Sequence, residues 1–142
     1  MATYFTNEGA FDLPDVGFTD RTVHLFEATD DAGDLGLMVV RTNMPEGKSL
    51  RELVEAHIID EAKKLGGFKI LEQREAFWAG VPAIEICSRW RSDGQVMYQR
   101  QVHLAAQGLW LLFASTAPIA EQVACDKIMD HVLTSFRLHN AG

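Results

Sequence analysis

Apolar and polar residues alternate with a period of two through much of the second half of the chain, as they do in half-buried β-strands. The alternating runs are interrupted at short segments that contain glycine and favour tight turns. These separators are Gly80, Asp93-Gly94 and Gln107-Gly108. The pattern predicts an antiparallel meander of four strands, at Phe68–Ala76, Ala83–Arg91, Val96–Ala106 and Leu109–Ser115.

Two other segments have the three- and four-residue apolar spacing of a helix with one buried face. Ser49 and Glu52 form a capping box at the start of the first helix, which runs to about Leu65 and stops at Gly66-Gly67. The second predicted helix spans about Ala120 to Phe136. Its apolar stripe consists of Cys125, Ile128, Met129, Val132, Leu133 and Phe136.

The first third of the chain contains shorter strand-like runs. Tyr4–Leu13 is typical of one or two strands broken at Asn7-Glu8-Gly9, and Thr22–Ala28 and Leu35–Arg41 form two further strands. No linker, low-complexity tract or repeat divides the chain, so residues 1–142 are predicted to form a single domain. Helices set among runs of strands predict the α+β class, with two main helices packed on a largely antiparallel, twisted sheet.

The dipeptide Asp93-Gly94 predicts the register of the central hairpin, because glycine accepts the positive φ of a two-residue turn. With this loop, Trp90 faces Met97 and Ile86 faces Gln101. A core would exclude amides and a solvated face would carry more charge, so we predict that the mixed face of this hairpin binds another polypeptide. That face carries Ile84, Ile86, Ser88, Trp90, Met97, Gln99, Gln101 and His103.

The run Leu109–Phe113 is apolar on both faces of its strand. Leu111 and Phe113 point to one side, whereas Trp110 and Leu112 point to the other. Two interpretations stay open: the strand is central with both faces covered, or its second face is covered by a partner. Together with the mixed hairpin face, this apolar excess leads us to expect a homodimer.

Composition restricts the class of partner. The formal net charge is −7 at pH 7, and no basic patch that could neutralise nucleic-acid phosphates is visible. The N-terminus lacks the features of a signal peptide, and the longest apolar run, Leu109–Ala114, is far shorter than the roughly 20 residues of a membrane-spanning helix. With only two cysteines and no motif spacing, we expect a cytoplasmic protein that binds no nucleic acid and does not insert stably into membranes.

The sequence contains no recognisable active site. The five histidines have none of the spacings of a metal site. Cys125 lies on an apolar helix face beside Asp126, an environment that disfavours a thiolate nucleophile. Phosphate-cradling loops and nucleophile elbows are missing from the sequence as well. We therefore expect no enzymatic activity, no metal and no cofactor.

The basic residues Arg89, Arg91 and Arg100 have two interpretations. They can pair across strands with Glu85 and with acids from the first half of the chain. They can also form a rim that docks an acidic partner or a second subunit. The sequence favours the first interpretation.

Seven short segments are spread over residues 3–138: Asn7–Pro14, Asp20–Phe26, Pro45–Gly47, Gly67–Lys69, Trp90–Gly94, Tyr98–Gln101 and Ser135–Leu138. In this order and spacing they resemble the DcrB-like domain family, which has a Mog1/PsbP-type fold. Within that family the chain is most similar to the Eag (effector-associated) chaperones of bacterial type VI secretion.

This resemblance implies a non-enzymatic, cytoplasmic homodimer that binds the hydrophobic, transmembrane-like N-terminal segments of a secreted toxin and helps to load it on the spike. Spike proteins would then be indirect partners. The chain departs from the family pattern at His57 and Glu61, where a Gln and a small residue are expected, so the client is not identified. The alternative is a small-ligand-binding or accessory domain. The resemblance and the hairpin face together give the expected partner-binding residues Val23, Leu25, Met38, Met97, Gln99 and Gln101.

Overall fold

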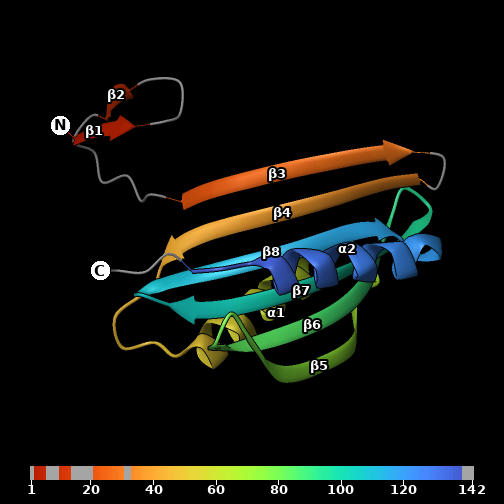
Figure 1. Ribbon diagram of the computed structural model, residues 1–142. Coiled ribbons are helices and arrows are strands. Elements are labelled where there is room, and N and C mark those ends of the chain that lie inside the picture. Colours follow the sequence, from red (N-terminus) through yellow and green to blue (C-terminus); the bar gives the residue numbers. More distant parts are fainter. Residues whose placement is uncertain (1, 6–9, 14–20, 31–32, 139–142) are drawn as a thin grey trace.

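The computed structural model describes residues 2–5, 10–13, 21–30 and 33–138. Its main body is a six-stranded antiparallel sheet with the strand order β3-β4-β8-β7-β6-β5. One helix lies on each face of this sheet (Figure 1). The predicted α+β class, with two main helices packed on an antiparallel sheet, is confirmed.

The last four strands form the predicted meander, each pairing with the next along the chain. Two-residue turns join them, and both residues of each turn have positive φ, as at Asp93 (51°) and Gly94 (77°). This is the backbone of a primed turn, which suits glycine at its second position. The four strands are β5 (Lys69–Trp78), β6 (Val81–Ser92), β7 (Gln95–Ala106) and β8 (Leu109–Pro118).

The predicted register of the central hairpin is confirmed. Trp90 pairs with Met97, and Ile86 pairs with Gln101. All the residues of the predicted hairpin face therefore lie on one side of the sheet.

Two strands from the first part of the chain complete the sheet: β3 (Arg21–Asp30) and β4 (Gly33–Asn43). β4 pairs with β8, so β8 is central in the sheet and β3 forms one edge. This pairing makes β8 central, as in the first interpretation of its apolar run, while Trp110 and Leu112 on its second face line an open cavity. A separate hairpin of β1 (Ala2–Phe5) and β2 (Ala10–Leu13) confirms two short strands, and the predicted break at residues 7–9 lies outside the described residues.

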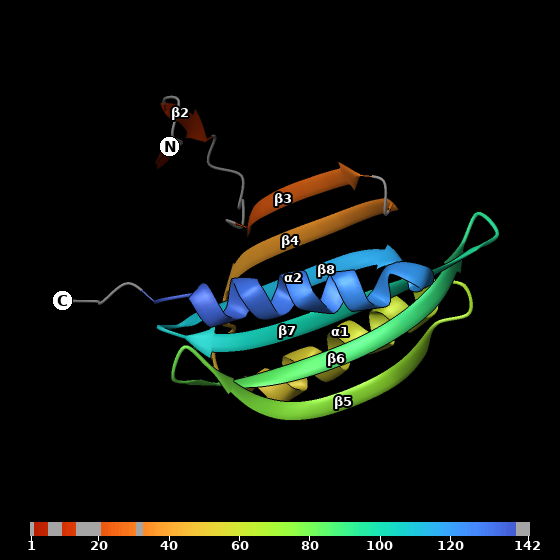
Figure 2. The ribbon, with the colours of Figure 1, turned by 45° about the vertical axis from the view of Figure 1, so that its right-hand side comes forward.

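The first helix, α1 (Leu50–Lys64), begins at its predicted cap. The backbone N–H of Glu52 donates a hydrogen bond of 3.2 Å to Ser49 Oγ, which satisfies one of the free donors of the first turn. On the inner side of the helix, Val54 is buried against Ile84 and Ile86 of β6. α1 is thus anchored over the β6–β7 part of the sheet (Figure 2).

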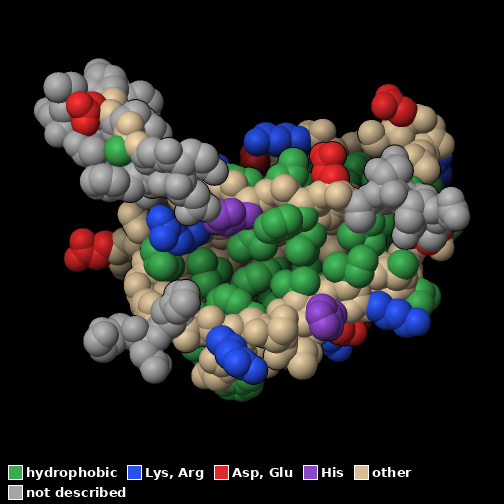
Figure 3. Space-filling model, turned by 45° about the horizontal axis from the view of Figure 1, so that its top comes forward, with side chains coloured by type: hydrophobic (Ala, Val, Ile, Leu, Met, Phe, Trp, Pro, Cys, Tyr) green, Lys and Arg blue, Asp and Glu red, His purple; other side chains and the backbone are tan. Residues whose placement is uncertain are grey.

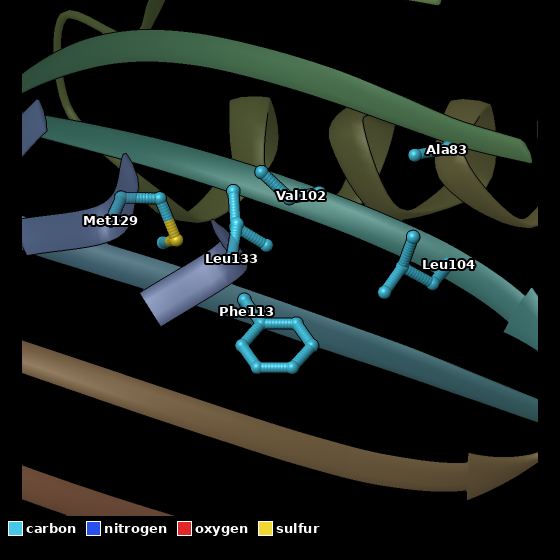
Figure 4. Close-up of a cluster of buried hydrophobic side chains, with 6 residues drawn as sticks. All are labelled: Ala83, Val102, Leu104, Phe113, Met129 and Leu133. Atoms are coloured by element: carbon cyan, nitrogen blue, oxygen red, sulfur yellow. The ribbon is translucent and has the colours of Figure 1, made fainter. Parts of the chain in front are cut away.

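The second helix, α2 (Gln122–Ser135), follows a short 3-10 turn at Ile119–Glu121 and covers the opposite face. Its spacing of four residues places Cys125, Met129 and Leu133 in the core, where all three are buried. Figure 4 shows the main cluster, in which the helix packs on β6, β7 and β8. The members of the cluster are Ala83, Val102, Leu104, Phe113, Met129 and Leu133.

Neither helix lies across the β3–β4 part of the sheet (Figures 1 and 2). β3 accordingly keeps apolar side chains in solvent: Val23 is 50% exposed, Leu25 63% and Phe26 57%. Large exposed apolar groups on an edge strand mark a surface that is suited to a partner.

Candidate binding groove

A groove runs beside α1, on the same face of the sheet, over β3, β4 and β8. Its cavity volume is about 260 Å³. Most of its lining is apolar, with His57 contributed by α1. We call this site the β3 groove; it is lined by Arg21, Val23, Met38, Val40, Thr42, His57, Trp110 and Leu112.

The register of three strands builds the floor of the β3 groove in rows. Val23 pairs with Val40, which pairs with Leu112. In the next row, Leu25, two residues after Val23 on β3, pairs with Met38, two residues before Val40 on the antiparallel strand β4. Because residues two apart share a face, these rows form one continuous apolar floor.

Three of the six expected partner-binding residues belong to this site. Val23 and Met38 line the β3 groove, and Leu25 extends its floor beside Met38. The other three, Met97, Gln99 and Gln101, lie on the same face of the sheet but on β7.

The interpretation of the β7 amides needs correction. Gln101, Ser88 and His103 are buried in the structure, at 1%, 0% and 0% exposure. Gln101 and His103 enter this core because they hydrogen-bond to each other, which removes most of the cost of burying them, whereas the Ser88 hydroxyl is buried without a hydrogen-bond partner among the described residues. This half of the hairpin face is therefore an interior, and the open surface lies beside it over β3, β4 and β8.

A chain of hydrogen bonds connects the β3 groove with this buried polar cluster. Trp110 Nε1 donates to His103 Nδ1 at 3.1 Å, and His103 Nε2 lies 2.8 Å from Gln101 Oε1. Gln101 Nε2 in turn donates to Glu61 Oε1 at 2.7 Å and to Gln99 Oε1 at 2.6 Å. The buried amides thus position groove residues instead of lining the groove themselves.

The two residues that depart from the family pattern, His57 and Glu61, lie next to each other beside this hydrogen-bonded cluster. His57 Nε2 lies 2.6 Å from Glu61 Oε1, one turn along α1. The His57 ring also packs edge-on against Trp110, with a centroid distance of 6.1 Å and an interplanar angle of 88°. His57 and Trp110 therefore form an aromatic end of the groove. Glu61 contacts His57 there, and His103 accepts the hydrogen bond from Trp110.

A second hollow, of about 330 Å³, lies on the α2 side, and its charges already have partners. Arg100 Nη2 contacts Glu85 Oε1 at 2.7 Å, and its Nη1 contacts Asp130 Oδ1 at 2.7 Å. Burial lowers the pKa of Arg100, but the hydrogen bonds with Glu85 and Asp130 raise it above its usual value overall. The expected pairing of Arg100 with Glu85 is present, although the further acid, Asp130, comes from α2 and not from the first half of the chain.

The cysteines are poorly suited to nucleophilic chemistry. Burial raises the pKa of Cys125 to about 11 and raises the pKa of Cys87 above its ordinary value. Both thiols therefore stay protonated near neutral pH, whereas a nucleophile needs the thiolate. Among the described residues, no group of three or more His, Cys, Asp or Glu side chains could hold a metal ion.

The sequence analysis missed five groove residues: Arg21, Val40, Thr42, Trp110 and Leu112. Their strands were identified, but the pairing of β4 with β8 joins segments that lie about 70 residues apart and leaves no local signal. Alternation places the groove residues of each single strand on one face, as with Met38, Val40 and Thr42 of β4, but it does not indicate that the three strands lie side by side.

A second apolar surface lies on the other side of β3 and β4. Phe26 pairs with Leu37 there, and Leu37 and Val39 border the core under α2. Figure 3 shows hydrophobic side chains gathered on this side of the molecule, beside α2. The β3–β4 pair is thus apolar on both faces.

None of the helices in the described part of the chain is long and apolar enough to cross a membrane. No curated protein matches the chain in sequence. Three solved structures resemble it at 11–18% sequence identity, and at such identity they establish its fold alone.

The crystal structure of PA94, a protein of unknown function from Pseudomonas aeruginosa, superposes with a TM-score of 0.79 at 18% identity, covering 99% of both chains. LpqN of Mycobacterium tuberculosis, involved in cell envelope biogenesis, gives a TM-score of 0.58 at 14% identity over 83% of both chains. The cyanobacterial PsbP protein CyanoP from Synechocystis sp. PCC 6803 gives 0.58 at 11% identity over 91% of this chain and 98% of its own.

These neighbours confirm the Mog1/PsbP-like fold that the sequence resemblance implied. The model of the DcrB family matches residues 8–135, which include β2 to β8 and both helices. The protein is therefore a member of the DcrB family.

Proposed function

We propose that this protein is a chaperone or adaptor that holds a hydrophobic segment of another protein in the β3 groove. The observation that carries the proposal is the open apolar floor of Val23, Leu25 and Met38 next to α1. Burying a leucine or valine side chain completely stabilises a complex by about 1.5–3 kcal/mol. A few such contacts supply the driving force for binding an apolar client.

The client we propose is an apolar, transmembrane-like segment near the N-terminus of a type VI secretion toxin. Such a segment aggregates in water unless its surface is covered. The resemblance of the sequence to the Eag chaperones supports this client class, delivery of the toxin to the spike, and action in the cytoplasm before export. In this role the protein has no enzymatic activity.

Binding of a small ligand is the second candidate. The aromatic end formed by His57 and Trp110, with the apolar rows beyond it, could hold an amphiphile in the volume of about 260 Å³. The open floor at Leu25, which is 63% exposed, favours the larger client. We therefore rank protein binding first.

The proposal is tested by coexpressing the chain with the N-terminal, transmembrane-like segment of a type VI secretion toxin and measuring how much of the toxin copurifies. Leu25→Asp would place an unpaired carboxylate against the client, at a cost of several kcal/mol, and should abolish copurification. Because Leu25 is exposed in the free protein, the variant should fold normally.

Val123→Asp is the matched control, since Val123 is similarly exposed (68%) but lies on α2. This variant should retain the toxin. Full copurification with a correctly folded Leu25→Asp variant would show that the β3 groove does not bind the client. A lipid-like compound found in the purified wild type, with no toxin bound, would favour the small-ligand function.

A further inference from the structure

The apolar floor of the β3 groove ends in opposite charges. Arg21, Val23, Leu25 and Glu27 occupy alternate positions of β3 and so share the groove face. Both Arg21 and Glu27 are exposed. A basic side chain therefore stands at one end of the floor and an acidic side chain at the other.

The two ends also differ in their hydrogen-bonding groups. Arg21 pairs in register with Thr42, which places a guanidinium and a hydroxyl at the same end. Glu27 is exposed and pairs with Gly36, which has no side chain and where an added Cβ would meet nothing within 4 Å. One end thus offers donors and the other offers an acceptor.

The dimensions of this floor match one α-helix. Three strands spaced about 4.8 Å apart give a width of about 10 Å, close to the diameter of a helix. The six-residue step from Arg21 to Glu27 spans about 20 Å of strand, the length of roughly 13 helical residues. A helix lying there would fill the layer that α1 occupies over the other half of the same sheet face.

A helix is itself polar along its axis. Its first turn leaves N–H groups without partners and carries partial positive charge, whereas its last turn leaves free carbonyls and carries partial negative charge. From this match, we propose that the β3 groove binds its apolar helix in one direction, with the helix N-terminus at Glu27 and its C-terminus at Arg21. The client then runs antiparallel to β3.

This inference rests on the proposed function and adds the direction of the client. In the opposite orientation, the free carbonyls would meet the Glu27 carboxylate and the free N–H groups would meet Arg21. At both ends of the helix, groups of like partial charge would then repel each other, and the free backbone groups would lack hydrogen-bond partners. Apolar contacts alone do not discriminate between the directions, so the choice falls to Arg21 and Glu27.

Photo-crosslinking measures the direction. The probe is a synthetic 14-residue helix of leucine and alanine with two glutamines at each end and benzoylphenylalanine near either its N- or its C-terminus. After irradiation with the full-length protein, peptide mapping should find the N-terminal probe attached near Glu27 and Gly36. The C-terminal probe should be attached near Arg21, Thr42 and Trp110.

A charge exchange provides the second arm. The double variant Arg21→Glu with Glu27→Lys keeps the net charge but reverses the polarity, so the two crosslinking patterns should exchange. A second peptide carries charged flanks, in place of the glutamines, that complement the two ends of the wild-type groove. The double variant should bind this peptide about three- to tenfold more weakly than the wild type does. The control is Glu55→Lys with Lys127→Glu, an exchange at two exposed helix positions that should leave the pattern unchanged.

The outcomes separate the two proposals. If the peptide binds but both probes label both ends, or label the reverse ends, the direction is wrong and the groove function stands. Patterns that stay unchanged in a folded Arg21→Glu, Glu27→Lys variant would also overturn the direction. If the wild type does not bind the peptide in the groove at all, the proposed function fails and the direction fails with it.

Discussion

Trp110 Nε1 donates a hydrogen bond of 3.1 Å to Nδ1 of His103. Because the indole is only a donor, His103 must accept at Nδ1 and carry its proton on Nε2, which then donates to Gln101 Oε1 at 2.8 Å. The tautomer of a fully buried histidine is thereby determined by one residue of the β3 groove. Desolvation, with a smaller contribution from His57, lowers the pKa of His103 to about 3, so its ring stays neutral at physiological pH.

The first prediction concerns acid stability. Between the ordinary histidine pKa of about 6.5 and the folded value of about 3, the unfolded chain binds a proton that the folded chain does not. The contribution of His103 is therefore fully present above about pH 6.5 and is lost as the pH falls towards 3. Between pH 6 and pH 4, His103 should lower the free energy of unfolding of the wild type by about 2–3 kcal/mol. This loss should be absent in His103→Gln, whose amide can still accept and donate hydrogen bonds but does not titrate. Urea unfolding at several pH values measures this difference.

His131→Gln serves as its control, because His131 is exposed on α2. This variant should keep the slope of the wild type. An unchanged slope in His103→Gln would show that His103 is not the group that is buried in its neutral form.

The second prediction concerns the buried ion pair. Glu85 is 3% exposed and relies on Arg100 for its closest contact, at 2.7 Å. Arg100→Met should lower the free energy of unfolding by about 3–5 kcal/mol, because it leaves a buried carboxylate with only Arg74 as a partner. Arg51→Met breaks the exposed pair with Glu75 and should cost less than about 1 kcal/mol. Comparable losses in chemical denaturation would contradict the assignment of Glu85–Arg100 as an interior pair.

The third prediction tests the α2 core with neighbouring residues. Met129 is fully buried, whereas Ile128 on the same helix is 37% exposed. Met129→Ala should cost about 2–5 kcal/mol through lost transfer energy and the cavity that it leaves. Ile128→Ala should cost about 1 kcal/mol or less. Thermal or urea unfolding of the two variants separates these values, and equal losses would mean that α2 packs in a different rotation.

The fourth prediction concerns self-association. We expect a homodimer that buries the apolar surface around Phe26, Leu37 and Val39, on the side of β3 opposite the groove. Light scattering at micromolar concentration should give twice the chain mass of 15.8 kDa. Phe26→Lys should yield a monomer, whereas Leu25→Lys, which changes the other face of the same strand, should leave the dimer intact. A monomeric wild type, or a dimer that resists Phe26→Lys, would contradict this interface.

Local patterns predicted most of the fold. The Asp93-Gly94 turn set the pairing of Trp90 with Met97, and the capping box at Ser49 marked the first residue of α1 to within one position. These features depend on neighbouring residues, whose backbone and hydrogen-bonding preferences act over a few positions. The strands that the sequence analysis expected are all present, and most are longer at their ends.

Long-range pairing was the part that local patterns could not supply. Gln101 and His103 were assigned to an open surface because amides usually avoid a core, yet they are buried and bonded to each other beneath α1. Identifying that interior requires knowing which half of the sheet α1 covers and that β4 pairs with β8. Val23, Leu25 and Met38, which the family resemblance implies as contacts, lie together on the groove face.

The two walls of the β3 groove differ in how they are attached to the molecule. α1 is packed on buried residues of the sheet, whereas β3 pairs with β4 alone among the strands of the described residues. Segments with few buried contacts open at a small fraction of the global unfolding free energy. The α1 wall of the groove is therefore rigid and the β3 wall is able to move. The groove can adjust its width to clients whose apolar faces carry side chains of different size.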